Sequence, residues 1–222
     1  GTNLGLAEHL NTTATVNGST NAGGLAGVNR GVVTESYSTA TVNGSTNVGG
    51  LIGENRGIVN ESYAVASVSG IDSVGALVGQ VGASRTDATV AAAYAAGSVE
   101  GDTNVGGLIG NVTDSWTITD AYWDVNTTGQ DTSAGSATGL TTSQLKANTS
   151  LAFDFETTWN VRTGGEVSYP FLLNNTQVPA PGLETVDTTT PEISAFSASN
   201  PSSQDVAVNF NSDEQLATIR IS

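Results

Sequence analysis

An eight-residue block, Thr-Asn-Val-Gly-Gly-Leu-Ile-Gly at residues 46–53, occurs in four slightly different copies in the first half of the chain. The copies span residues 20–27, 46–53, 73–79 and 103–110. Within them, Gly24, Gly50 and Ala76 are 26 residues apart, and Gly107 follows after 31. A fixed period of about 20 to 50 residues is typical of a solenoid, in which one supersecondary unit stacks on copies of itself. We therefore expect a repeat architecture and not a compact helical globule.

Each repeat combines short extended runs with turn residues. In one repeat the runs cover residues 40–42, 47–52 and 58–64, and Asn43-Gly44 separates the first two. Asn-Gly pairs supply the positive φ that tight turns need, whereas Val, Ile, Thr and Tyr favour a pleated surface. The pattern predicts one coil of a three-sided parallel β-solenoid. Antiparallel hairpins in a propeller or sandwich are the alternative, but the period is short for a propeller blade of about 40 to 45 residues.

Equivalent residues of successive repeats are expected to lie above one another in columns. A tyrosine follows each block and has two alternative roles: a ladder that stabilises the stacked coils, which we favour, or an outward platform for sugar stacking. The expected column residues are Gly24, Leu25, Gly50, Leu51, Leu77, Gly107, Leu108, Tyr37, Tyr63, Tyr94 and Tyr122.

The repeat pattern ends near Tyr122, and aromatic residues become frequent in the next fifty positions. An open solenoid end exposes apolar core and unpaired strand edges, so this aromatic segment is expected to form a C-terminal cap. Beyond residue 190, extended runs at 193–199, 206–210 and 217–221 resemble the first strands of an immunoglobulin-like module.

The predicted fold class is therefore all-β, namely a parallel β-solenoid (β-helix) of about four coils with an aromatic cap, followed by a partial immunoglobulin-like β segment. The expected organisation is a repeat solenoid at 1–122, a cap at 123–173, a linker at 174–190 and the immunoglobulin-like segment at 191–222.

The charge balance is strongly acidic. Twenty-one Asp and Glu face six Lys and Arg, which gives a formal net charge of -15. This sign argues against nucleic acid as a partner, because phosphate binding needs clustered Lys and Arg. Acidic surfaces suit strong brine, where screening over about 3 Å at 1 M salt removes self-repulsion. We interpret the chain as an exported protein of a salt-adapted cell, with an ordinary acidic secreted domain as the alternative.

Cysteine is absent, so the chain has no disulfides and no thiolate metal sites. No run approaches the roughly 18 apolar residues of a membrane span. Asn-x-Ser/Thr sequons, which mark candidate N-glycosylation sites, favour export, and Asn17 and Asn43 occupy equivalent repeat positions. The candidate sites are Asn11, Asn17, Asn43, Asn60, Asn111, Asn126, Asn148 and Asn174.

Catalytic and metal-binding motifs are weak. His9 is the one histidine, and without a second histidine or a cysteine it is expected to be exposed or to have a capping role. Asp124, Asn126 and Thr128-Gly129 have the oxygen spacing that begins a calcium loop, but position twelve is Gly135 and not Glu. We expect no catalytic residue, no resident metal and no cofactor, with calcium at Asp124 as the one exception to be tested.

The blocks resemble the GLUG-repeat family, named for a Gly-Leu-hydrophobic-Gly core. The matching residues are 24–27, 50–53, 76–79 and 107–110, with Ala76 in place of the first glycine of the third copy. Segments 122–124, 139–145 and 153–172 look like the ending that follows such repeats. The resemblance implies location in large exported surface proteins, including adhesin-like proteins of bacteria and haloarchaea, and it transfers no active-site residue.

The expected function is that of a non-enzymatic, extracellular segment of a cell-surface protein that spaces or presents binding surfaces for adhesion. Its expected partners are other surface-protein domains, identical subunits or cell-surface glycans. One alternative is a subunit of an extracellular filament completed by strand sharing between neighbours. Another is a polysaccharide-active β-helix enzyme, which would need two carboxylates converging in a cleft.

Overall fold

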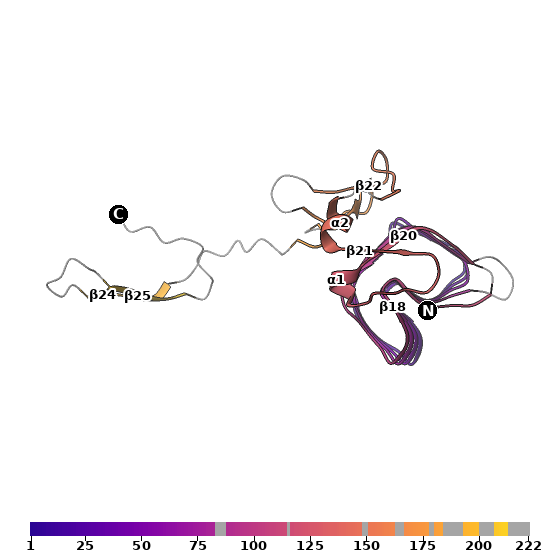
Figure 1. The fold of residues 1–222 in the computed structure, drawn as a ribbon, viewed down its shortest axis with the longest axis horizontal. Helices are drawn as coiled ribbons and strands as arrows, with labels where there is room; N and C mark the ends of the chain where they lie inside the picture. Colours follow the sequence, from indigo (N-terminus) through magenta and orange to yellow (C-terminus); the bar gives the residue numbers. More distant parts are fainter. Residues whose placement is uncertain are drawn as a thin grey trace. The chain divides into compact units, whose positions relative to one another are not determined.

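A computed structural model describes residues 1–82, 88–114, 116–147, 151–162, 167–177, 180–183, 193–199 and 207–212. The chain forms two compact units, Gly1–Leu183 and Glu184–Ser222. The first unit is a solenoid of parallel strands, and in Figure 1 the strands of successive coils lie behind one another. The all-β class and the parallel stacking expected from the repeat are therefore confirmed.

Each coil contributes strands to four parallel sheets, here called A to D. Sheet A contains β1 (Thr2–Asn3), β6 (Ala26–Asn29), β11 (Ile52–Asn55), β15 (Val78–Val81) and β19 (Ile109–Val112). Sheet B contains β2 (Leu6–Glu8), β3 (Asn11–Thr12), β7 (Val32–Thr34), β8 (Tyr37–Ser38), β12 (Ile58–Val65), β16 (Ala88–Ala96), β20 (Trp116–Asp124) and β21 (Thr138–Leu140). Sheet C contains β4 (Thr15–Asn17), β9 (Thr41–Asn43), β13 (Ser67–Ser69) and β17 (Val99–Glu100). Sheet D contains β5 (Thr20–Gly23), β10 (Thr46–Gly49), β14 (Asp72–Gly75) and β18 (Thr103–Gly106).

The coils build four parallel sheets, whereas the sequence predicted a three-sided coil. The run expected at 47–52 is divided into β10 and β11 by a bend at Gly50 and Leu51. The side chain of Leu51 is fully buried at this bend. The Gly-Leu pair therefore marks a corner, and the small residue there lets the chain turn inside a crowded interior.

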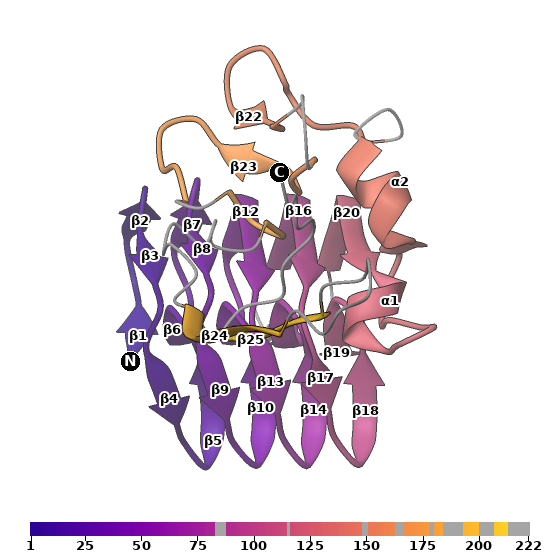
Figure 2. The same cartoon turned by 90° about the vertical axis from the view of Figure 1, so that its left-hand side faces the viewer.

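The repeated leucines stack directly above one another. The amide of Leu25 donates to the carbonyl of Leu51 at 2.9 Å, Leu51 donates to Leu77 at 2.9 Å, and Leu77 donates to Leu108 at 2.9 Å. Figure 2 shows the same order in the rows of strands, with β5, β10, β14 and β18 side by side. The column arrangement expected from the repeat is confirmed.

Residues before the first Gly-Leu block also join the stack. Strands β1 to β4 pair in parallel with β6, β7, β8 and β9. At this end of the stack Asn3 donates to Asn29 at 2.9 Å, and Asn29 donates to Asn55 at 2.8 Å, which makes a ladder of side-chain amides. Residues 2–17 thus contribute strands to sheets A, B and C.

Glycines of the repeat hold sheets A and D in close contact. A Cβ on Gly53 of β11 would lie 2.6 Å from the backbone carbon of Asn21 and 2.7 Å from the carbonyl oxygen of Gly27. One on Gly79 of β15 would lie 2.4 Å from the amide nitrogen of Val48. Any side chain at these positions would push the two sheets apart, so the glycines of the block are a packing requirement.

Small aliphatic side chains fill the interior of the coils. The fully buried members include Val33, Val42, Val48, Leu51, Ile52, Val59, Val74, Leu77, Val78, Val90, Leu108 and Ile109. β-Branched residues suit this pleated interior because they pack against equivalent side chains one strand away.

The segment after β20 closes the last coil. It contains α1 (Val125–Thr128), β21 and α2 (Thr142–Ala147). Ala134 donates its amide to the carbonyl of Ile109 at 3.0 Å, and Gly107 donates to Thr132 at 2.9 Å. The indole of Trp123 lies in the apolar interior and donates to the carbonyl of Gln130 at 2.9 Å. Neither helix of the described chain is long and apolar enough to cross a bilayer.

The aromatic residues expected as an end cap lie elsewhere. Phe153, Trp159 and Tyr169 pack on the flank of the stack, against tyrosines that belong to different coils. The short strands β22 (Trp159–Asn160) and β23 (Phe171–Leu172) pair antiparallel there, and Figure 2 shows them beside several coils. At the end of the described stack, α1 and α2 pack beside β20, and residues 132–140 extend the last coil.

The second unit is described over two strands. β24 (Ile193–Ser199) and β25 (Ala207–Ser212) pair antiparallel. The runs expected at 193–199 and 206–210 correspond to them, whereas the run expected at 217–221 lies outside the described residues. The immunoglobulin-like assignment of this unit stays a prediction.

We predict that Gly53→Ala lowers the free energy of unfolding by about 1–3 kcal/mol or more, as overpacking does. The new methyl group would collide with backbone atoms of sheet D, which cannot move aside as a side chain can. Denaturant unfolding followed by far-UV circular dichroism measures the change. The matched control is Gly5→Ala, because a Cβ at Gly5 meets no atom within 4 Å. Equal stability of the two variants would contradict the close contact of the sheets.

Candidate functional site

The tyrosines of the repeat form a buried column. Tyr63 is in register with Tyr37 on one side and with Tyr94 on the other. The rings of Tyr37 and Tyr63 are 4.9 Å apart with planes inclined by 5°, and those of Tyr63 and Tyr94 are 5.1 Å apart and inclined by 7°. These spacings match the roughly 4.8 Å between neighbouring strands, so the backbone register imposes the stacking. The fourth member, Tyr122, is in register with Tyr94.

A layer of aromatic side chains from the C-terminal segment covers this column. Trp159 contacts both Tyr63 and Tyr94, with ring centroids at 6.0 and 5.9 Å. Phe153 stacks on Trp159 at 4.6 Å and meets the ring of Tyr122 edge-on at 5.5 Å. The exposed fractions of the four tyrosines are 8% or less. The column is therefore an internal ladder, and the alternative of an outward sugar-stacking platform is wrong for these residues.

The tyrosine hydroxyls attach the covering segment by hydrogen bonds. Tyr94 donates to the carbonyl of Pro170 at 2.7 Å, and Tyr63 donates to the side-chain oxygen of Gln177 at 3.1 Å. Tyr169 donates to the buried carboxylate of Asp124. Burial raises the pKa of Tyr63 and of Tyr94 well above the ordinary value, so both hydroxyls stay protonated donors.

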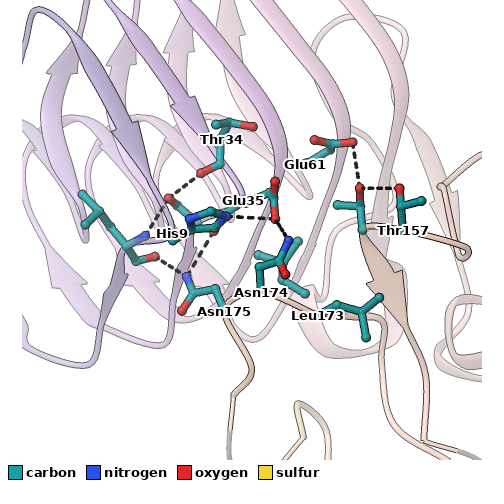
Figure 3. Close-up of polar contacts among 12 residues, drawn as sticks. His9, Thr34, Glu35, Glu61, Thr157, Leu173, Asn174 and Asn175 are labelled. Carbon is teal, nitrogen blue, oxygen red and sulfur yellow. Dashed lines mark hydrogen bonds and ion pairs between the residues drawn. The ribbon is translucent and has the colours of Figure 1, made fainter.

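A polar seam runs beside the aromatic layer, where residues 173–175 meet the first coils (Figure 3). Its main members are His9, Glu35 and Glu61, which occupy equivalent positions of successive coils. His9 follows the last residue of β2, Glu35 follows the last residue of β7, and Glu61 lies inside β12. All three have left-handed backbones, with φ of 54°, 41° and 45°. The repeat thus stacks three titratable side chains in one column.

Asparagine side chains of the C-terminal segment are hydrogen-bonded to this column. Asn174 donates to Oε2 of Glu35 at 3.0 Å. Asn175, which is buried, donates to the carbonyl oxygens of Leu10 at 2.9 Å and Glu35 at 3.1 Å. The linker expected from residue 174 therefore does not start there, because residues 174 and 175 are part of the first unit.

Glu61 is the titratable group of the seam with a perturbed pKa. Partial burial raises the pKa of its carboxyl, and the nearby charge of Glu35 raises it further. A hydrogen bond from the hydroxyl of Thr158, at 3.4 Å, opposes this shift. The ionised carboxylate is thus less favourable here than in the unfolded chain.

His9 has acidic neighbours that could share a cation with it. Its Nε2 atom lies 3.1 Å from Oε2 of Glu35. One ligand atom from each of Glu8, His9 and Glu35 falls within 4.8 Å of the other two. Sequence reasoning placed His9 without metal-binding partners, and the structure supplies two carboxylates. The missed signal is that His9 precedes Glu35 by one repeat length, the spacing that also separates Glu35 from Glu61.

The oxygens considered for a calcium loop have other partners. Asp124 is the N-cap of α1, and its Oδ1 accepts from the amides of Asn126 at 2.9 Å and Thr127 at 3.3 Å. The side-chain oxygen of Asn126 accepts from the amide of Thr142 at 3.0 Å. Helix capping accounts for the Asp-x-Asn spacing, with Gly129 as the left-handed C-cap.

The candidate glycosylation sites differ in exposure. Asn11, Asn17, Asn126 and Asn174 are exposed, Asn43, Asn60 and Asn111 are half-buried, and Asn148 lies outside the described residues. Asn43 donates to the side-chain oxygen of Asn17 at 3.0 Å, so these equivalent positions lie in one column. Their modification stays a prediction.

Comparisons of the chain with protein-family models, with curated proteins and with solved structures found no match. The site is therefore interpreted from its own geometry, which combines a sealed aromatic ladder with a partly exposed acidic seam containing the one histidine.

We predict that Trp159→Ala lowers the free energy of unfolding by about 3–5 kcal/mol, the usual cost of truncating a buried aromatic side chain. Trp159 is fully buried and bridges tyrosines of two coils. Chemical denaturation followed by far-UV circular dichroism measures the loss. As control, Trp116→Ala removes a side chain that is 37% exposed and should lower stability by clearly less than Trp159→Ala does. Equal losses would show that the aromatic layer does not stabilise the column.

A pH dependence follows from the raised pKa of Glu61. The folded chain binds the Glu61 proton more tightly than the unfolded chain, so this group stabilises the fold below the ordinary value of 4.5 and loses that effect as the pH rises through the raised pKa. We expect Glu61→Gln to be more stable than the wild type at neutral pH, and the difference to disappear in acid. Thermal melts across the acidic range measure it. Glu100→Gln, at an exposed position, is the control that should show no such difference. A difference that grew toward low pH would contradict the assignment.

Proposed function

We propose that this chain is a non-enzymatic structural segment of an exported cell-surface protein, in which a GLUG-type solenoid spaces or presents binding surfaces for adhesion. The observation that carries the proposal is the tyrosine column sealed under the C-terminal aromatic layer. The most distinctive side chains of the repeat are used to join coils to one another and to the covering segment. Such an arrangement makes the stack of coils rigid.

The interior of the coils supports the same function. Aliphatic side chains fill it, and the stacked leucines are joined by a continuous series of backbone hydrogen bonds. Such a stack resists bending because each coil is held by its neighbours along its whole outline. A spacer outside a cell needs this property more than it needs a deep cleft.

The acidic charge and the sequons support an extracellular location. A net charge of -15 keeps a surface hydrated and soluble in brine, where screening reduces repulsion between carboxylates. The paired Asn17 and Asn43 place two sequons side by side on sheet C. Sugar attached there would cover one side of the stack.

A filament subunit is a second candidate, favoured by exposed leucines and singly paired strands among residues 2–17. Leu4, Leu6 and Leu10 are 74%, 65% and 44% exposed. Among the described residues, β1 and β4 each pair with one neighbouring strand only, so each has a free edge. Free edges of this kind accept a strand from another chain.

The proposal is tested on intact cells that make the protein. We expect an antibody to the solenoid to label them without permeabilisation, and the purified chain to release no reducing ends from extracellular polysaccharides. Labelling only after permeabilisation would overturn the surface assignment, and released reducing ends would overturn the non-enzymatic one. Sedimentation of the purified chain separates the two candidates, since assembly that grows with concentration favours the filament.

A further inference from the structure

We propose that Glu8, His9 and Glu35 form a binding site for a divalent transition-metal ion, for which Zn²⁺ is the best fit. The ion would join the coil of residues 2–17 to the coil that follows it. This inference is independent of the proposed surface function, because it rests on the local geometry of three side chains.

The backbone explains why two consecutive residues face the same ion. In a regular strand, neighbouring side chains point to opposite faces. His9 follows the last residue of β2 and has a left-handed backbone with φ of 54°. This local turn brings the imidazole to the side on which Glu8 lies, so that both offer ligand atoms to one point.

The parallel register brings in the third ligand. Glu8 is paired with Thr34, and Glu35 follows Thr34 as His9 follows Glu8. Glu35 repeats the left-handed conformation with φ of 41°, and its carboxylate therefore lies over the imidazole (Figure 3). The pairing that stacks the coils thus stacks the ligands as well.

The distances suit a tetrahedral ion. Zn–N and Zn–O bonds of about 2.0–2.2 Å place tetrahedral ligand atoms about 3.3–3.6 Å apart. Nε2 of His9 and Oε2 of Glu35 are 3.1 Å apart, and all three ligand atoms lie within 4.8 Å of one another. Glu8 is exposed, so a rotation of its side chain can bring its oxygen closer without repacking the core.

The donor set favours zinc over calcium or magnesium. Calcium and magnesium prefer oxygen ligands, whereas zinc binds both imidazole nitrogen and carboxylate oxygen. Two carboxylates balance the charge of a divalent ion, and the neutral imidazole supplies the third bond. Three protein ligands leave the fourth position to water.

Hydrogen bonds from Asn174 and Asn175 hold two of the ligands in place. Asn174 donates to Oε2 of Glu35 at 3.0 Å and limits the rotation of that carboxylate. Asn175 donates to the carbonyl oxygens of Leu10, next to His9, and of Glu35 itself. One buried amide therefore fixes the backbone beside both ligands, and such outer contacts orient metal ligands.

The single histidine of the chain makes the test direct, because its ring gives one set of imidazole signals. The folded 222-residue chain is titrated with Zn²⁺ and followed by long-range ¹H–¹⁵N NMR of the imidazole. We expect a saturable shift of the Nε2 signal at one equivalent of Zn²⁺. Glu8→Gln and Glu35→Gln should each weaken binding by more than the about 10–100-fold that loss of a contact orienting a ligand costs.

The matched control is Glu61→Gln, which removes the same charge from the adjacent coil of the column and leaves the three ligands intact. It should change the affinity by much less than either ligand variant. No shift with excess Zn²⁺, unchanged affinity in either ligand variant, or equal losses in all three variants would overturn the site. Circular dichroism confirms folding, and Glu8→Gln, at an exposed strand end, decides the question if Glu35→Gln does not fold.

Discussion

Hydrogen bonding between equivalent backbone groups of successive coils is the constraint on which the other features of the solenoid depend. Leu25, Leu51, Leu77 and Leu108 are joined in this way, and the spacing between coils is the spacing between strands. Each side chain then lies above its counterpart. Where the counterparts are aromatic they stack, as Tyr37 and Tyr63 do, and where they are amides they form a ladder, as Asn29 and Asn55 do.

Stacking equivalent residues brings side chains of the same charge close together, which is unfavourable. An uninterrupted column of carboxylates would repel itself at strand spacing. In the column of His9, Glu35 and Glu61, the imidazole lies at one end, and donors from Asn174 and Thr158 reach the two carboxylates. The covering segment therefore contributes to the electrostatics of the coils as well as to their packing, while burial and then the charge of Glu35 raise the pKa of Glu61.

The parts of the fold that the sequence could predict are those that the period alone determines. A repeated Gly-Leu block and a repeated tyrosine are sufficient to predict parallel stacking, the leucine column and the internal ladder, because each follows from placing equivalent residues one strand apart. The four-sheet coil could not be read in this way. The bend at Gly50 and Leu51 that divides 47–52 into β10 and β11 brings Gly53 and Gly79 against the backbone of sheet D, a contact between sheets that the period alone does not reveal.

Other features were hidden because they join segments far apart in the chain. Residues 2–17 lack the full Gly-Leu-hydrophobic-Gly block, and Asn17 was the one position matched in sequence, to Asn43. Their pairing with β6 to β9 shows that the whole segment joins the stack. The aromatic segment at 153–172 has the composition of an end cap, and composition does not distinguish the end of a stack from its flank. The proximity of His9 to Glu8 and Glu35 depends on left-handed φ at a position that no glycine or asparagine marks.

The C-terminal segment packs along the flank of the stack, and this position affects how the protein unfolds. A plain solenoid has interactions between neighbouring coils only, so its terminal coils can fray while the middle stays folded. Here Trp159 contacts two coils, Gln177 is bonded to Tyr63, and Asn175 reaches the coil of Leu10. These contacts act as a splint along the stack, because an end coil cannot separate without releasing a segment that also holds the middle. The splint makes unfolding a single cooperative event instead of a gradual loss of coils from one end.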